Sequence, residues 1–170
     1  IVKEKDMTKF HFKKLFNGSV WQADRIVSVN EAGEIVSIEN GTVGDHYFDI
    51  AVPGFQNAHS HAFQYAMAGL AELHSTAQTP DDFWSWREAM YALVDTLTPE
   101  SAHEHSLRAF REMRTAGITS VGEFHYIHHS DAGLDFALDE AVLAAAHDAD
   151  IRIVLLHACY LAGGFGAPIA

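Results

Sequence analysis

The chain has 170 residues, 48% of them hydrophobic and 20% charged, which is an ordinary globular composition and enough for a domain core. Its formal net charge of -12 argues against nucleic acid or an anionic membrane as partner, because both bind basic surfaces. The single cysteine, Cys159, excludes an internal disulfide, and no apolar run reaches the length of a membrane span. Together with the absence of a signal-peptide pattern, these features predict a cytoplasmic protein.

The first fifty residues predict a small antiparallel β-sheet. Strands are expected at 9–16, 21–29 and 34–39, where apolar and polar residues alternate. Asn17-Gly18 and Asn40-Gly41 are strong turn signals between strands. No chemistry is assigned to this segment.

Residues 51–61 predict a short buried strand that ends in His59-Ser60-His61. Side chains at i and i+2 of a strand point to the same side, so the two imidazoles can reach one point. Neutral imidazole is a good ligand for zinc and related divalent metals. The alternative is a pair of half-buried histidines satisfied by their neighbours.

Composition weakens the motif, since 12 histidines in 170 residues give about one His-x-His by chance. A second copy, His103-Glu104-His105, lies in a predicted helix at 98–116. Residues two apart on a helix occupy different faces, so that pair is a poor chelator. Only the first pair follows an apolar run and a Pro-Gly turn.

The rest of the chain alternates between helices and strands. Helices are expected at 62–73, at 79–97 after the Thr79 cap, at 98–116 after the Thr98 cap with Gly117 as the stop, and at about 138–149. Strands are expected at 118–124 and at 151–156, the latter as an apolar run buried on both faces. This order implies parallel βαβ units with their strands side by side in sequence order, and sites form at the carboxyl ends of such strands.

Several longer motifs occur in order along residues 53–166. They are His59-Ser60-His61-Ala62-Phe63-Gln64, Phe83-Trp84-Ser85-Trp86-Arg87 and Glu123-Phe124-His125-Tyr126. With these motifs the sequence resembles the formimidoylglutamate deiminase (N-formimino-L-glutamate iminohydrolase) family of the amidohydrolase superfamily. The resemblance implies a small β-sandwich fused to a (β/α)8 TIM-like barrel with one catalytic zinc. Residues 1–50 would be a β-sandwich segment, and residues 51–170 the first three βα units of the barrel.

The resemblance also implies a reaction and a set of residues. The reaction is hydrolysis of the formimino group of N-formimino-L-glutamate to N-formyl-L-glutamate and ammonia, a step of histidine degradation. His59 and His61 match metal ligands, while Gln64, Arg87 and Tyr126 match residues that contact the substrate's carboxylates. From the sequence alone, we would expect the Gln64 amide to be solvated on a helix and Arg87 to make a cation–π contact at the surface.

The sequence departs from the family by stopping after the third barrel strand. A (β/α)8 barrel takes about 250 residues, so we expect an incomplete fragment that is inactive alone. No catalytic acid or base is assignable, because those residues and the remaining metal ligands come from later strands. The identity of the divalent metal and a homodimer are left open.

Two other functions compete with this reading. The chain could belong to another amidohydrolase that deaminates or dechlorinates a ring substrate, or it could be a catalytically inert, truncated metal-binding protein. His125 is expected either to support the residues of the site from behind or to be structural, because only one of His125 and Tyr126 can face the barrel mouth. His128 and His129 are expected in a loop, and Cys159 is expected to be a buried, unreactive thiol.

Overall fold

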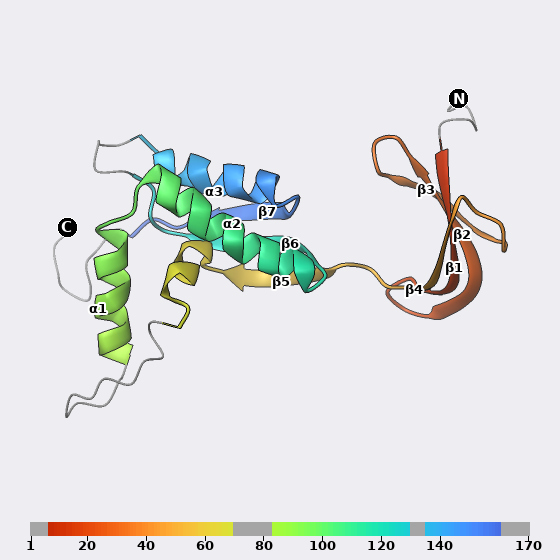
Figure 1. The fold of residues 1–170 in the computed structure, drawn as a ribbon, viewed down its shortest axis with the longest axis horizontal. Helices are drawn as coiled ribbons and strands as arrows, with labels where there is room; N and C mark the ends of the chain where they lie inside the picture. Colours follow the sequence, from red (N-terminus) through yellow and green to blue (C-terminus); the bar gives the residue numbers. More distant parts are fainter. Residues whose placement is uncertain (1–6, 70–82, 130–134, 161–170) are drawn as a thin grey trace. The chain divides into compact units, whose positions relative to one another are not determined.

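A computed structural model of the chain describes residues 7–69, 83–129 and 135–160. The chain divides between Pro53 and Gly54 into two compact units, each with one β-sheet (Figure 1). The boundary predicted from the sequence lies after residue 50. None of the helices in the described residues is long and apolar enough to cross a membrane.

The first unit is a four-stranded sheet in the order β3-β2-β1-β4. Its strands are β1 (Met7–Phe16), β2 (Trp21–Asn30), β3 (Ile35–Asn40) and β4 (His46–Ala51). The predicted turn at Asn17-Gly18 joins β1 to β2. The Asn17 side chain accepts hydrogen bonds from the backbone N–H groups of Ser19 and Val20, both at 3.0 Å, and Gly18 has a φ of +97° that favours glycine.

The expectation of a wholly antiparallel sheet is wrong at β4, which pairs in parallel with β1. The expected single strand at 51–61 is also two strands, because β4 ends at Ala51 and β5 begins at Phe55. Proline lacks an N–H for a sheet ladder, so Pro53-Gly54 interrupts the extended run. A second sheet that would complete a sandwich is not present among the described residues of this unit.

The second unit is built on a parallel sheet in the order β5-β6-β7. The strands are β5 (Phe55–Ser60), β6 (Ile118–His125) and β7 (Arg152–His157). Sequential, parallel neighbours are the arrangement expected from the alternation of strands and helices, and the structure confirms it. The carboxyl ends of all three strands therefore meet at one edge of the sheet.

Two helices, α2 (Pro99–Thr115) and α3 (Ala137–Asp148), lie side by side against this sheet (Figure 1). The predicted start of α2 is confirmed, because Thr98 caps the helix in a capping box with Ser101 and Pro99 occupies its first turn. The core between helices and sheet includes Phe110 and Val142, both fully buried.

The alternation of β6 decides which side chains face the helices. Val121, Glu123 and His125 are buried, whereas the intervening residues are only half-buried. Strand β7 was expected to be buried on both faces, but Val154 is 63% exposed and Leu156 is 44% exposed. The helices described here cover one face of the sheet, so the apolar run of β7 is covered on that face alone.

The connection from β5 to α2 contains two short helices in the described residues. η2 is a 3-10 helix at Ala62–Met67, where a longer helix to residue 73 was expected. α1 runs over Phe83–Val94 and ends before the expected position 97. The predicted cap at Thr79 and Pro80 lies outside the described residues.

Candidate functional site

His59 and His61 stand together at the carboxyl end of β5. Their ring centroids are 4.7 Å apart and the rings are perpendicular. His61 Nδ1 lies 2.8 Å from the carbonyl oxygen of Phe124, and because a carbonyl only accepts, Nδ1 carries the proton. This leaves the lone pair of His61 on Nε2. A hydrogen bond from the other ring nitrogen to a backbone carbonyl is the usual support of a metal-binding histidine.

The electrostatic surroundings of His61 favour the form of imidazole that binds metal. Its pKa is lowered by burial, with a smaller contribution from His59, although the hydrogen bond to Phe124 opposes the shift. The neutral ring is therefore the stable form at neutral pH. The two residues fit a divalent transition metal, and two protein ligands leave its other coordination positions to further groups.

Gln64 and Tyr126 come together beside His61. Gln64 Nε2 donates to the Tyr126 hydroxyl at 2.8 Å, although the residues lie 62 positions apart in the chain. The rings of His61 and Tyr126 are 5.3 Å apart and perpendicular. Burial raises the pKa of Tyr126, so its hydroxyl stays protonated at neutral pH. An amide and a neutral hydroxyl are both able to donate hydrogen bonds to a carboxylate.

Arg87 lies on α1, which reaches this edge of the sheet through Met90. The buried Met90 sulfur accepts a hydrogen bond from Tyr126 at 3.6 Å, while Arg87 lies one turn away on the same helix. The guanidinium contacts Tyr91, with Nη2 2.9 Å from its hydroxyl and the charge 5.2 Å from the ring centroid. The structure thus shows the i,i+4 cation–π contact that the sequence offered as the alternative, and Arg87's role toward substrate stays a prediction.

Glu123 is a buried carboxyl that sequence reasoning missed. It is 0% exposed, and its Oε1 accepts the backbone N–H of Ala62 at 2.6 Å, directly after the histidine pair. Burial raises the pKa of Glu123, although the hydrogen bonds from Ala62 and Ser60 oppose the shift. The carboxyl therefore holds the backbone turn that aims His59 and His61. The alternation of β6, in which Glu123 falls on the same side as the buried Val121, is the sequence feature that could have identified it.

A second group of titratable side chains lies at the ends of β6 and β7. It consists of His125, His128, Asp139 and His157, which we call the histidine–aspartate cluster. His125 is fully buried, as a supporting or structural residue is expected to be, and His128 lies in the expected loop after β6, where it contacts Asp139. Asp139 was missed, because an acidic residue in the first turn of a helix is ordinarily explained by the helix dipole.

Cys159 and Tyr160, which follow β7 at this edge, are exposed. Tyr160 is 67% exposed, and its ring lies 6.0 Å from that of Tyr126. The expectation of a buried Cys159 is wrong, since its thiol is exposed. The chain leaves β7 two residues earlier, so the alternation of the strand no longer turns this side chain inward.

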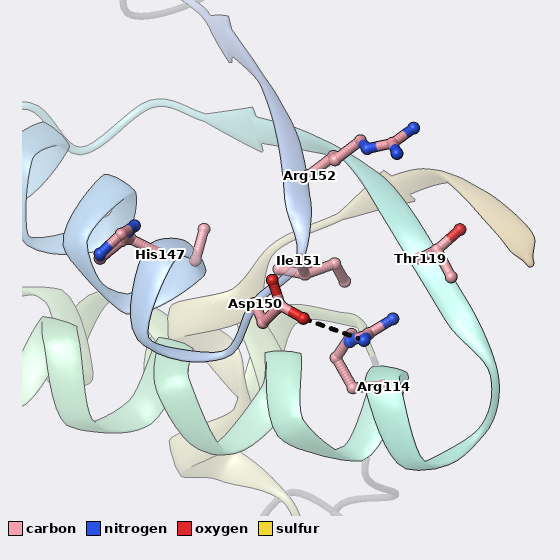
Figure 2. Close-up of a pocket in the computed structure, with 7 residues that line it drawn as sticks. Arg114, Thr119, His147, Asp150, Ile151 and Arg152 are labelled. Carbon is pink, nitrogen blue, oxygen red and sulfur yellow. Dashed lines mark hydrogen bonds and ion pairs between the residues drawn. The ribbon is translucent and has the colours of Figure 1, made fainter. Parts of the chain in front are cut away.

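A pocket of about 280 Å³ lies at the opposite edge of the sheet (Figure 2). It is lined by residues at the starts of β6 and β7, including Thr119 and Arg152, and is bordered by an Arg114–Asp150 ion pair at 3.2 Å. Sites form at the carboxyl ends of parallel strands, and this is the amino end. We therefore attribute the Arg114–Asp150 pair to joining α2 to the turn before β7.

Comparisons with known proteins agree with the geometry. The amidohydrolase family model matches residues 50–162. Formimidoylglutamate deiminase of Pseudomonas aeruginosa is 46% identical over 70% of this chain, which covers 27% of that protein. The crystal structure of an amidohydrolase from Brucella melitensis superposes with a TM-score of 0.85 at 38% identity, over 96% of this chain and 37% of that one.

A more distant likeness shows the fold alone. Atrazine chlorohydrolase from Arthrobacter aurescens, in a structure complexed with zinc, has a TM-score of 0.62 at 19% identity over 85% of this chain and 34% of its own. The chain thus spans between a quarter and two fifths of the length of the proteins it matches.

Proposed function

Because the chain belongs to the amidohydrolase family, we propose that its full-length form hydrolyses the formimino group of N-formimino-L-glutamate, giving N-formyl-L-glutamate and ammonia. The observation that carries the proposal is the placement of Gln64 and Tyr126 beside His61, at the carboxyl edge of the sheet. The 46% identity to a formimidoylglutamate deiminase supports the choice of substrate.

His59 and His61 are the residues of this chain that would hold a zinc ion in a (β/α)8 barrel. The His61 Nδ1–H is fixed on Phe124, so Nε2 is the nitrogen that would bind the metal, and Glu123 holds the backbone that joins the pair to Ala62. A zinc ion bound there supplies Lewis acidity and a water activated at neutral pH. Further ligands and the acid and base would come from outside this chain.

The other residues would act on the far end of the substrate. The Gln64 amide and the Tyr126 hydroxyl can donate to a carboxylate, and the guanidinium of Arg87 would supply a charged, forked contact. Binding energy from this remote end can orient the amidine carbon toward the metal, since interactions away from the reacting bond lower the barrier by positioning.

The test is ammonia release by the full-length protein from N-formimino-L-glutamate and from formamidine. Formamidine carries the amidine but no carboxylate, so the glutamate substrate should have the larger kcat/KM by several orders of magnitude. Equal kcat/KM values on the two compounds would contradict the substrate assignment and leave the metal site standing.

A ring substrate is the second candidate. Phe124 and Tyr126 flank His61, with ring centroids at 5.5 and 5.3 Å, and such aromatic side chains can stack on a heterocycle. Ammonia release from adenine or guanine nucleosides that exceeds release from the formimino compound would favour this candidate.

A further inference from the structure

The histidine–aspartate cluster gathers four side chains from separate parts of the chain. His125 ends β6, His128 follows it, Asp139 lies in the first turn of α3 and His157 ends β7. Asp139 is 7% exposed and lies 3.1 Å from His128, 3.3 Å from His157 and 3.6 Å from His125. The backbone around it is fixed, because Ala158 N–H donates to the His125 carbonyl at 2.8 Å.

His128 shows that the cluster needs a cation. Its Nε2 lies 2.8 Å from the carbonyl oxygen of Ala158, so Nε2 carries a proton. In a neutral ring the lone pair is then on Nδ1, which lies 3.1 and 3.2 Å from the two oxygens of Asp139. A lone pair against a carboxylate is repulsive unless a proton or a metal ion lies between them.

The surroundings of His125 indicate that the cation in the cluster is a metal ion and not a proton. Its side chain is fully buried, and among the described residues neither ring nitrogen makes a hydrogen bond of good geometry, although the Ile127 backbone lies near the ring. A proton on His128 would satisfy the His128–Asp139 pair but leave the His125 ring with only a 3.6 Å approach to Asp139, which is unfavourable for a buried polar group. A single metal ion can accept lone pairs from both histidines and from the aspartate.

We infer that His125, His128 and Asp139 form a binding site for a divalent transition metal of the zinc class, separate from the one at His59 and His61. Their ligand atoms all lie within 4.8 Å of one another. The separations of 3.1 Å and 3.6 Å from Asp139 bracket the edge of about 3.3–3.4 Å for a tetrahedron with bonds of about 2.0–2.1 Å.

The surroundings of the three ligands agree with a metal site. The His128 Nε2–H bond to Ala158 orients that ring, as the bond to Phe124 orients His61. His157 Nε2 lies 3.3 Å from the second oxygen of Asp139, and its ring stacks on His128 with centroids 3.7 Å apart. Stacked rings direct their lone pairs in parallel, so we assign His157 a hydrogen bond to the ligating carboxylate instead of a bond to the metal.

Such a metal would join the end of β6 to the start of α3. Tyr126 stands in the chain between two of the ligands, His125 and His128, so the metal would also fix the backbone that carries this residue. The inference does not depend on which substrate the protein uses, because metal content is measured without turnover.

The test counts metal in the full-length protein. After removal of metal with a chelator, zinc is titrated back against a chromophoric competitor and the bound metal is measured by mass spectrometry. The structure predicts at least two equivalents per chain in the wild type. Asp139→Asn should lose one equivalent, or weaken its binding by about 100-fold, and retain the other.

A control variant lies on the same helix. Asp148 forms a pair with His103 at 3.0 Å, but both side chains are substantially exposed, at 50% and 31%. Asp148→Asn is the same substitution in a His–Asp pair that belongs to no three-ligand group in the described part of the chain, and it should change neither the number of zinc equivalents nor their affinity. Equal losses in Asp139→Asn and Asp148→Asn would contradict the inference.

A second variant keeps the inference testable if Asp139→Asn fails to fold. The double variant His59→Ala and His61→Ala leaves the histidine–aspartate cluster intact and should still bind one zinc, with cobalt substitution giving the d–d absorption of a nitrogen- and oxygen-ligated ion. A double variant that binds no metal would overturn the inference and assign a proton to the His128–Asp139 pair.

Discussion

The histidine pair at 59 and 61 and the histidine–aspartate cluster lie near the same end of β6 but belong to opposite faces of it. The side chain of Phe124 meets the pair, with ring centroids 6.0 Å from His59 and 5.5 Å from His61, whereas the next residue, His125, is buried in the cluster. The difference teaches that one strand end can serve two sites, because consecutive side chains of a strand point to opposite sides.

The largest expected effect separates the two sites by function. His59→Ala in the full-length protein should reduce ammonia release from N-formimino-L-glutamate by several orders of magnitude, because it would remove a proposed ligand of the zinc ion that would activate water. One zinc equivalent should be lost and the one in the histidine–aspartate cluster retained. Loss of both equivalents at once would show that the two sites are not independent.

The next largest effect is on substrate binding, and it should leave both proposed metal sites unchanged. Arg87→Ala should lower kcat/KM for N-formimino-L-glutamate by about 10–100-fold, as expected for loss of a charged hydrogen bond of about 1.5–3 kcal/mol. The zinc content should stay unchanged. Arg108→Ala, on the exposed side of α2, is the matched control and should leave kcat/KM as it is. An unchanged kcat/KM in the Arg87→Ala protein would remove this residue from the substrate site.

The smallest effect is on stability, at the residue that connects the two faces. Glu123 shares the buried face with His125, yet its carboxyl holds the backbone after His61. Glu123→Ala should lower the free energy of unfolding by about 1–3 kcal/mol, because the Ala62 N–H loses its acceptor. Chemical denaturation followed by circular dichroism measures this change.

The pH dependence of Glu123 has a defined sign. Its pKa is raised by burial in the folded protein, so the native state binds the proton more tightly than the unfolded state. This contribution to stability is fully present below the unfolded pKa of about 4.3 and is lost as pH rises through the folded pKa. Glu123→Gln cannot ionise and does not lose this contribution. The melting temperature of the variant should therefore rise relative to that of the wild type as pH increases.

A surface carboxyl provides the comparison for this trend. Glu104 is exposed on α2, and Glu104→Gln should show no such gain over the same pH range. A difference between Glu123→Gln and the wild type that does not vary with pH would contradict the raised pKa.

Local signals explain what could be predicted from the sequence. The Thr98 cap with Pro99, the Asn17-Gly18 turn and the i,i+2 histidines each act over a few residues, and each is found where it was expected. The parallel order of the three barrel-type strands followed from their alternation with helices. Each of these features is set by residues that lie close together in the sequence or by the order of the elements.

Features that depend on long-range packing were missed. The parallel pairing of β4 with β1 is set by a neighbour more than thirty residues away, and nothing local in β4 specifies its direction. Asp139 and His157 join His125 only when α3 and β7 have packed against β6. Glu123 was passed over because a carboxyl within an apolar strand gives no local sign of the backbone N–H that it accepts.

The alternation of β6 also has a consequence for protein engineering. A combinatorial library at Phe124 alters the side of the strand that faces the histidine pair, while Glu123 and His125 keep their buried positions. The carbonyl of Phe124 that orients His61 is unaffected, because it belongs to the backbone. Directed evolution toward new substrates can therefore begin at Phe124, whereas Tyr126 also packs against the core cluster that contains Phe63 and Met90.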